Sequence, residues 1–230
     1  MNLTSRTSIL LAAVLAASSS RAGEIAGRVT LQGTPPQERT VDLELHPKLA
    51  TKYPSGLTTR HYQVGPANGL QNVLVYVNGE FEGKTFPRPR VPAVLEHRDG
   101  LFQPYVMGVQ IGQPLQLRCT DGTLCAFHAT AKRNQEFNVA PISETVSRTF
   151  TVPEMPVRFK CDLHPWNYAY VGVFAHPFFA VTGNDGRFVI PDVPPGRYTL
   201  EIFQPKAGRS SKEVEVSAGR TVVDFILLAK

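Results

Sequence analysis

The sequence predicts an all-β protein made of two small sandwiches. Its 230 residues include 19 prolines and 18 glycines, which disfavour helices, and the apolar runs between them are short. These runs are rich in valine, isoleucine, phenylalanine and tyrosine, which favour strands. Strands are therefore expected at residues 24–31, 72–77, 105–111, 114–119, 157–161, 170–174, 179–182, 187–190, 198–203, 212–216 and 221–228.

The first residues, 1–22, are expected to be a signal peptide. A positive start that ends at Arg6 is followed by the apolar run 8–17 and then by small residues up to Ala22, which is the order of a secretory signal. The apolar run is much shorter than the about 20 residues that a membrane span needs. The mature protein is expected to be periplasmic or secreted, without a membrane span; the alternative is a short uncleaved anchor.

The overall charge argues against a nucleic-acid partner. The chain has 24 Lys and Arg against 19 Asp and Glu, a net charge of +5, and the charges are interspersed.

The sequence contains no G-x-S-x-G or H-E-x-x-H motif and no glycine-rich phosphate loop. A binding or carrier protein is therefore expected, and not an enzyme.

The C-terminal third contains two sharp reversals. Asn184, Asp185 and Gly186 lie between two predicted strands, where Asn and Gly tolerate the positive φ of a hairpin turn. Pro195 and Gly196 mark the second reversal. Closely spaced short strands of this kind indicate a small β-sandwich.

The string VTGNDGRFVIPDVPPGRYTLEIF resembles the carboxypeptidase regulatory-like module, a small Ig-like or transthyretin-like sandwich. The opening strands of that family are similar to residues 27–33 and 72–77. The resemblance implies a module built from residues 23–90, with its connector, and residues 177–230. Residues 91–176 would then be a second domain, inserted in or adjacent to the first.

Cysteine and histidine pairs indicate a metal site. Cys161 and His164 have two residues between them in FKCDLHPW, and Cys125 and His128 repeat this spacing. Short loops of this kind can direct a thiolate and an imidazole at one ion. Cys119 makes the number of cysteines odd, so at least one sulfur must be free, metal-bound or paired with another chain.

Residues 91–176 resemble a cupredoxin, a Greek-key β-sandwich that binds copper. The segment CDLHPWNYAYVGV is similar to the amicyanin-type loop C-x-x-H-P-[FW]-M. The resemblance implies Cys161 as the equatorial thiolate and His164 as the exposed imidazole. Two positions depart from the family: Cys125 stands at the first histidine ligand, and Asn167 at the axial methionine. An amide oxygen can serve as a weak axial ligand, but loss of a histidine alters the trigonal plane.

Three outcomes follow from a thiol at position 125. Cys125 and Cys161 can form a disulfide, which would leave the site without metal. Both can instead stay reduced around Cu(I) or Zn²⁺ in a Cys₂His or Cys₂His₂ site. His128 can also replace the missing imidazole in a redox copper centre, but this needs a bulge because positions 125 and 128 point to opposite faces of a strand. Cys119 is expected to be buried and free; a Cys119–Cys125 bridge is the remaining alternative.

The other histidines are expected to have no ligand role. His46, His61 and His97 are expected at the surface, and His176 is expected to be structural. Trp166 either forms an apolar docking patch beside His164 or covers the loop.

The sequence thus favours an exported copper-binding or soft-metal-binding protein, with electron transfer to a redox or cell-envelope partner. The alternative is a metal-free module that binds glycan or protein and carries a Cys125–Cys161 disulfide.

Overall fold

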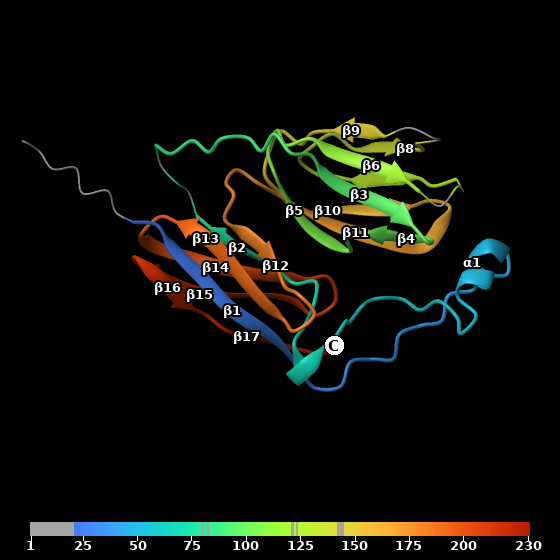
Figure 1. Cartoon of the computed structure of the whole chain (residues 1–230), viewed down its shortest axis with the longest axis horizontal. Coiled ribbons are helices and arrows are strands. Elements are labelled where there is room, and N and C mark those ends of the chain that lie inside the picture. Colours follow the sequence, from blue (N-terminus) through green and yellow to red (C-terminus); the bar gives the residue numbers. More distant parts are fainter. Residues whose placement is uncertain (1–20, 80, 82, 121, 123, 142–144) are drawn as a thin grey trace, which may run out of the picture.

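The predicted all-β class is confirmed by the structure, a computed structural model that describes residues 21–79, 81, 83–120, 122, 124–141 and 145–230. Strands account for most of its regular structure, and the elements form four sheets (Figure 1). The predicted signal peptide, except for Arg21 and Ala22, lies outside the described residues. Within the described part of the chain, no helix is long and apolar enough to cross a membrane.

The first sandwich combines the N-terminal strand with C-terminal strands. Strand β1 pairs antiparallel with β13 and parallel with β16 and β17, and β14 lies between β2 and β15 in the facing sheet. The strands of the first sheet are β1 (Gly23–Gln32), β13 (Arg187–Val193), β16 (Gly219–Val222) and β17 (Phe225–Leu228). Those of the second are β2 (Leu74–Asn78), β12 (Phe179–Val181), β14 (Gly196–Gln204) and β15 (Gly208–Val216).

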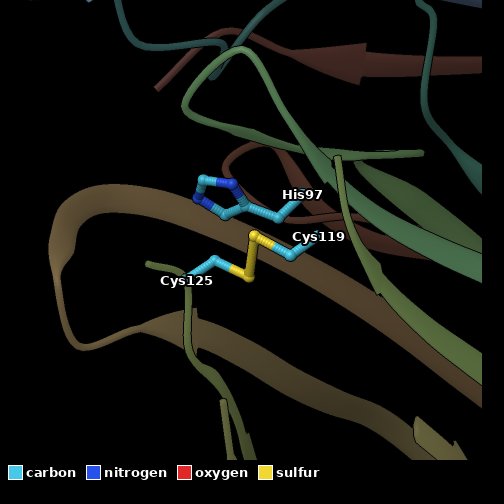
Figure 2. Close-up of side chains that lie close together, drawn as sticks. All are labelled: His97, Cys119 and Cys125. Carbon is cyan, nitrogen blue, oxygen red and sulfur yellow. A yellow bond between two sulfur atoms is a disulfide. The ribbon is translucent and has the colours of Figure 1, made fainter. Parts of the chain in front are cut away.

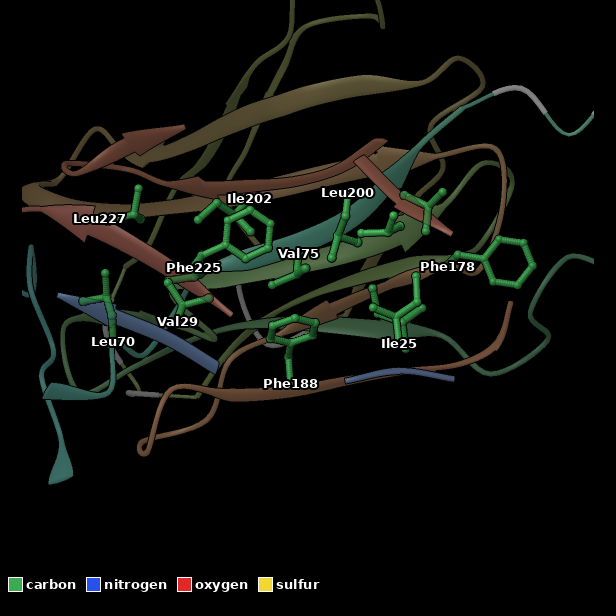
Figure 3. Packing of buried hydrophobic residues seen from close by; sticks show 14 of the residues in the cluster. Ile25, Val29, Leu70, Val75, Phe178, Phe188, Leu200, Ile202, Phe225 and Leu227 are labelled. Carbon is green, nitrogen blue, oxygen red and sulfur yellow. The ribbon is translucent and has the colours of Figure 1, made fainter. Parts of the chain in front are cut away.

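The core of the first sandwich lies between these two sheets (Figure 3). Alternate residues of a strand point to one face, so each strand contributes every second side chain to the core. Ile25 and Val29 of β1 meet Val75 of β2, Ile202 of β14 and Phe225 of β17, all at most 1% exposed. Full burial of each such side chain contributes about 1.5–3 kcal/mol.

The predicted turn at residues 184–186 is present, but it does not close a hairpin within one sheet. Strands β12 and β13 on its two sides belong to different sheets, so the chain crosses from one layer of the sandwich to the other here. Gly186 has a φ of 78°, and a Cβ at this position would lie 2.3 Å from the Val29 carbonyl oxygen. Glycine is therefore required for the turn to pack against β1.

The second sandwich is formed by the central part of the chain. Its larger sheet has the order β5-β11-β10-β7-β8 and its smaller sheet the order β4-β3-β6-β9. The strands of the larger sheet are β5 (Val106–Gln110), β7 (Phe127–Thr130), β8 (Phe137–Val139), β10 (Glu154–Cys161) and β11 (His164–Phe174). Those of the smaller sheet are β3 (Ala93–Arg98), β4 (Leu101–Gln103), β6 (Leu115–Cys119) and β9 (Val146–Arg148).

A separate apolar cluster joins the two sandwiches. Leu74 and Tyr76 of β2 and Phe203 of β14 pack with Val106 of β5 and Phe174 of β11. The five side chains are at most 9% exposed. The sheet that contains β2 and β12 therefore faces the strands β5 and β11 of the second sandwich, as Figure 1 shows.

Residues 41–57, here named the cover segment, lie at the far end of the second sandwich from this junction (Figure 1). They include the short helix α1 (Pro47–Lys52), and a 3₁₀ turn (Pro66–Asn68) follows them. The segment packs against Leu101 of β4 and Trp166 of β11. Its own buried apolar residues are Val41, Leu43, Leu49 and Leu57. This segment, in which no strand was expected, thus folds over one end of the second sandwich.

Candidate metal centre

The turn between β10 and β11 brings Cys161 and His164 together. Cys161 ends β10 and His164 begins β11, and the two residues are paired across the turn. The distance from Cys161 Sγ to His164 Nδ1 is 3.2 Å. The predicted juxtaposition of this thiol and imidazole is therefore present. Both side chains are buried, at 2% and 4% exposure, so the exposed position that the resemblance implied for His164 is wrong.

His97 of β3 provides a second imidazole at the same place. Donor atoms of His97, Cys161 and His164 all lie within 4.8 Å of one another, and the centroids of the two imidazole rings are 4.8 Å apart. His97 is fully buried, with 0% exposure. Two imidazoles and one thiol are the donor types that suit copper in a trigonal site, and they also accept zinc.

The surroundings of Cys161 favour its thiolate. Burial raises the pKa of the thiol, but hydrogen bonds with the His164 and His97 rings and with backbone amides outweigh this effect and bring the pKa to about 6. One of these amides is the Ala126 N–H, which donates to Sγ at 3.4 Å. The sulfur is thus held by groups from separate elements before any metal binds.

Aromatic side chains enclose the inner side of the donor set. Phe102 of β4 packs edge-on against the His97 ring, with centroids 5.5 Å apart, and Phe127 of β7 lies next to Phe102 at 4.9 Å. Both phenylalanines are fully buried. The inner side of the site is therefore apolar, which strengthens the interaction between a bound cation and its thiolate.

The alternative in which Cys125 and Cys161 form a disulfide is wrong, and the alternative Cys119–Cys125 bridge is present. The Cα atoms of Cys119 and Cys125 are 6.3 Å apart, and Figure 2 shows the bond between their sulfur atoms. Cys161 is a free, buried thiol. Strand β6 ends at Cys119, and the chain returns within six residues to Cys125, so these two sulfurs meet first. The expectation of a free Cys119 is also wrong, and the sulfur of Cys125 is occupied.

His128 lies on the outer face of the larger sheet. Its Nδ1 is 3.0 Å from Asp162 Oδ2 and its Nε2 is 2.8 Å from Glu136 Oε1. Its neighbours Phe127 and Ala129 on β7 point into the core. The strand has no bulge that would turn His128 inward, so both ring nitrogens are engaged by carboxylates and lie apart from the buried donor set.

Asn167 lies on β11 within the buried interior. It is 1% exposed, and its Oδ1 accepts a hydrogen bond from the Phe102 backbone N–H at 2.6 Å. The side chain therefore links β11 to β4. Its role as a weak axial ligand stays a prediction, and it would require the same oxygen to reach the metal.

The surface position expected for His97 is wrong, and its place beside Cys161 and His164 was not predicted. The missed signal is the alternation within β3: Leu95 and His97 point inward, whereas Arg98 points to solvent. The strands expected from the sequence do not include residues 93–98, so they give no inward-facing position for His97. Strand alternation would have placed it on the core side.

A second missed residue lies above the site. His46 was expected at the surface, but it is half-buried in the cover segment, and its ring lies 5.0 Å from that of His164. Trp166 packs edge-on against both rings, at 5.0 Å from His46 and 5.3 Å from His164. Trp166 also donates from Nε1 to the Gly100 carbonyl. The imidazole of His164 is thus covered by these two side chains.

Comparison with known families gives one match. Residues 174–223 match the family model described as polysaccharide lyase family 4, domain II. The match includes strands β12 to β15 of the first sandwich and covers less than a quarter of the chain. No curated protein matches the chain.

Solved structures similar to the chain include several copper proteins. A copper-containing nitrite reductase from Thermus scotoductus has a TM-score of 0.34 and 17% identity, over 42% of this chain and 25% of that chain. An oxidised amicyanin variant has a TM-score of 0.32 and 14% identity, over 43% of this chain and 90% of that chain. A purple cupredoxin from Nitrosopumilus maritimus has a TM-score of 0.30 and 14% identity, over 36% of this chain and 97% of that chain.

Proposed function

We propose that this chain binds one copper ion through His97, Cys161 and His164 and carries single electrons. The observation that supports the proposal is the convergence of two imidazoles and one thiol from three strands in a buried position. This donor set fits copper, because a thiolate and two imidazoles stabilise both Cu(I) and Cu(II). His97 would replace the histidine that position 125 lacks.

The side chains around such an ion would have different roles. Copper supplies a one-electron couple when bound. Cys161 provides the strong thiolate donor, and the hydrogen bond from the Ala126 N–H reduces the negative charge on its sulfur. Phe102 and Phe127 keep water from the inner side of the site. His164 contacts His46 of the cover segment and lines the groove beside it, so electrons would enter and leave on that side.

The surface around His164 suits a protein partner. A groove of about 420 Å³ is lined by residues of the cover segment and by His164 itself. Three apolar side chains on its rim are exposed to solvent: Leu45, Leu124 and Leu163. We place the protein outside the cytoplasm, as the signal-like N-terminus suggests, with a cell-envelope redox protein as partner. In this proposal it is a carrier and not an enzyme.

A copper titration with matched variants tests the proposal. Titration of the purified mature chain with Cu(II) is expected to give one bound ion and a visible thiolate-to-copper charge-transfer band. The substitution His97→Ala removes a ligand and is expected to weaken binding by more than about 100-fold, because loss of even an outer partner costs 10–100-fold. His128→Ala is the control, because His128 lies on the outer face. Circular dichroism confirms that both variants are folded.

The metal-free scaffold predicts the opposite outcome. In that case neither Cu(II) nor Cu(I) binds to the folded chain with Cys161 in its reduced form. Binding that is equally weakened by His97→Ala and His128→Ala would place copper on the surface, which would also contradict the proposal.

A further inference from the structure

His97 belongs to two groups of donor atoms. One is the set with Cys161 and His164. The other contains Cys119 and Cys125, whose sulfurs and a His97 ring nitrogen also lie within 4.8 Å of one another (Figure 2). The copper proposal uses only the first group, and it leaves the two sulfurs of the disulfide without a role.

The backbone fixes the second group as firmly as the first. His97 and Cys119 are direct partners in the parallel ladder between β3 and β6. Cys125 is 1% exposed and directly precedes Ala126, whose N–H donates to Cys161 Sγ. Strand pairing thus places Cys119 beside His97, the disulfide holds Cys125 there, and Cys161 lies near the same imidazole in the first group. Breaking the disulfide would release two thiols that are already next to a buried nitrogen.

The disulfide is within reach of a reductant from outside. Cys119 is half-buried, and both Arg118 and Thr120 beside it are exposed. Exposed disulfides are the ones that exchange with other thiols, whereas fully buried ones are inert. Cys125 is 1% exposed, so an external dithiol would approach the disulfide from the Cys119 side, with Cys125 as the leaving sulfur.

We propose that reduction of the Cys119–Cys125 disulfide opens a second metal site, in which His97 and the two released sulfurs bind a soft cation such as Cu(I), Zn²⁺ or Cd²⁺. The reductant is a dithiol. Its two thiols give up two electrons and two protons and join as a new disulfide, while the Cys119–Cys125 bond breaks and both cysteines become thiols. Each thiol then loses its proton to solvent when the cation binds.

The oxidation state of the disulfide would then decide the chemistry of the centre. With the disulfide closed, the available donors are two imidazoles and one thiolate. With the disulfide open, a cation bound to His97 can also bind the thiolates of Cys119 and Cys125. Sets rich in thiolates favour Cu(I) and Zn²⁺. The inference does not rest on copper binding at the first set, because each set has thiols of its own.

Cys161→Ser isolates the second site. Cd²⁺ is the probe, because its bonds to thiolates give an ultraviolet charge-transfer absorption. A phosphine reductant breaks the disulfide without adding a competing thiol. Without oxygen, the Cys161→Ser chain is expected to bind no Cd²⁺ before reduction and one ion per chain after it. His97→Ala in this background should weaken the binding, whereas His128→Ala should leave it unchanged.

The reciprocal variant is Cys119→Ser with Cys125→Ser. It retains His97, Cys161 and His164, so its metal binding is expected to be the same with and without reductant. The inference is overturned if the reduced Cys161→Ser chain binds no Cd²⁺, or if the gain on reduction persists in the reciprocal variant. Failure of the copper proposal would appear elsewhere, as the absence of a Cu(II) band in the unreduced wild type.

Alkylation of the wild-type chain gives a readout that needs no variant. The reduced protein is treated with iodoacetamide with or without Cd²⁺, and its peptides are mapped by mass spectrometry. Cd²⁺ is expected to protect both Cys119 and Cys125. Equal labelling of these two cysteines with and without saturating Cd²⁺ would contradict the second site even if a variant failed to fold.

Discussion

The imidazole rings of His97 and His164 lie with their centroids 4.8 Å apart, although their strands belong to opposite sheets of the second sandwich. His97 comes from β3 in the smaller sheet, and His164 begins β11 in the larger one. A metal bound by both would therefore link the two sheets at this end. This arrangement makes the donor set a property of the folded sandwich and not of one local loop.

The disulfide is expected to be dispensable for the copper site but not for stability. The variant with Cys119→Ser and Cys125→Ser keeps the three proposed ligands, so its visible Cu(II) band should persist. Loss of a crosslink over a sequence separation of six residues is expected to lower the free energy of unfolding by about 2 kcal/mol. Urea denaturation and a copper titration of the same sample measure both effects. Loss of the band in a folded variant would contradict a copper site that needs only His97, Cys161 and His164.

The cover segment is expected to limit access to His164. Leu49 of α1 is 8% exposed and packs in the apolar cluster that holds the segment in place. Leu49→Ala should weaken this packing by about 2 kcal/mol. That loss corresponds to a rise of roughly 30-fold in the open population of the segment. Modification of His164 by diethyl pyrocarbonate, followed by peptide mapping, should become faster.

Leu45 provides the matched control for the cover segment. It lies in the same segment but is 88% exposed, so Leu45→Ala removes little packing. The modification rate of His164 should stay at the wild-type value in this variant. Equal rates in wild type, Leu49→Ala and Leu45→Ala would contradict the role of the segment as a cover.

His176 is expected to make the protein less stable in weak acid. It is 7% exposed, stacks on Phe178 and accepts a hydrogen bond from the Phe178 N–H at its Nδ1. Burial lowers its pKa from 6.5 to about 4. Between these two values the unfolded chain binds more protons than the folded chain, so stability falls as the pH falls from 6.5 towards 4. The loss from this group is up to about 3 kcal/mol.

His176→Asn tests this pH dependence. The amide oxygen of Asn can accept the same backbone hydrogen bond, but it does not titrate. The free energy of unfolding should therefore fall less between pH 7 and about pH 4 in the variant than in the wild type. The comparison uses the change with pH in each protein, so any constant cost of the substitution cancels. The same loss in both proteins would contradict the assignment to His176.

The sequence predicted the part of the site that is local in the chain. Cys161 and His164 are separated by a two-residue turn, so their spacing alone implied that they meet. The burial of His164 was not predicted, because the resemblance implied an exposed imidazole, whereas the cover segment encloses its ring. For Cys125 the sequence left open a ligand position, which the resemblance implied, and a disulfide with Cys161 or with Cys119. The structure has the disulfide with Cys119, six residues away in the chain.

The positions of His97 and His46 depend on contacts between distant segments, which no local sequence pattern shows. His97 lies more than sixty residues before Cys161, and its place follows from the parallel pairing of β3 with β6. His46 lies in a segment with little regular structure, and it reaches His164 only because Leu49 and its neighbours bury apolar surface against Trp166. Periodicity identifies strands, but the pairing and packing of distant segments depend on the whole fold.

X-ray absorption at the copper edge tests the proposed centre most directly. The unreduced protein with one copper per chain is expected to show one sulfur and two imidazole nitrogens close to the metal, and His97→Ala should remove one of the two imidazoles while the sulfur stays. A bound copper without a sulfur neighbour, or one that keeps both imidazoles in the folded His97→Ala variant, would contradict the assignment of His97, Cys161 and His164 as ligands.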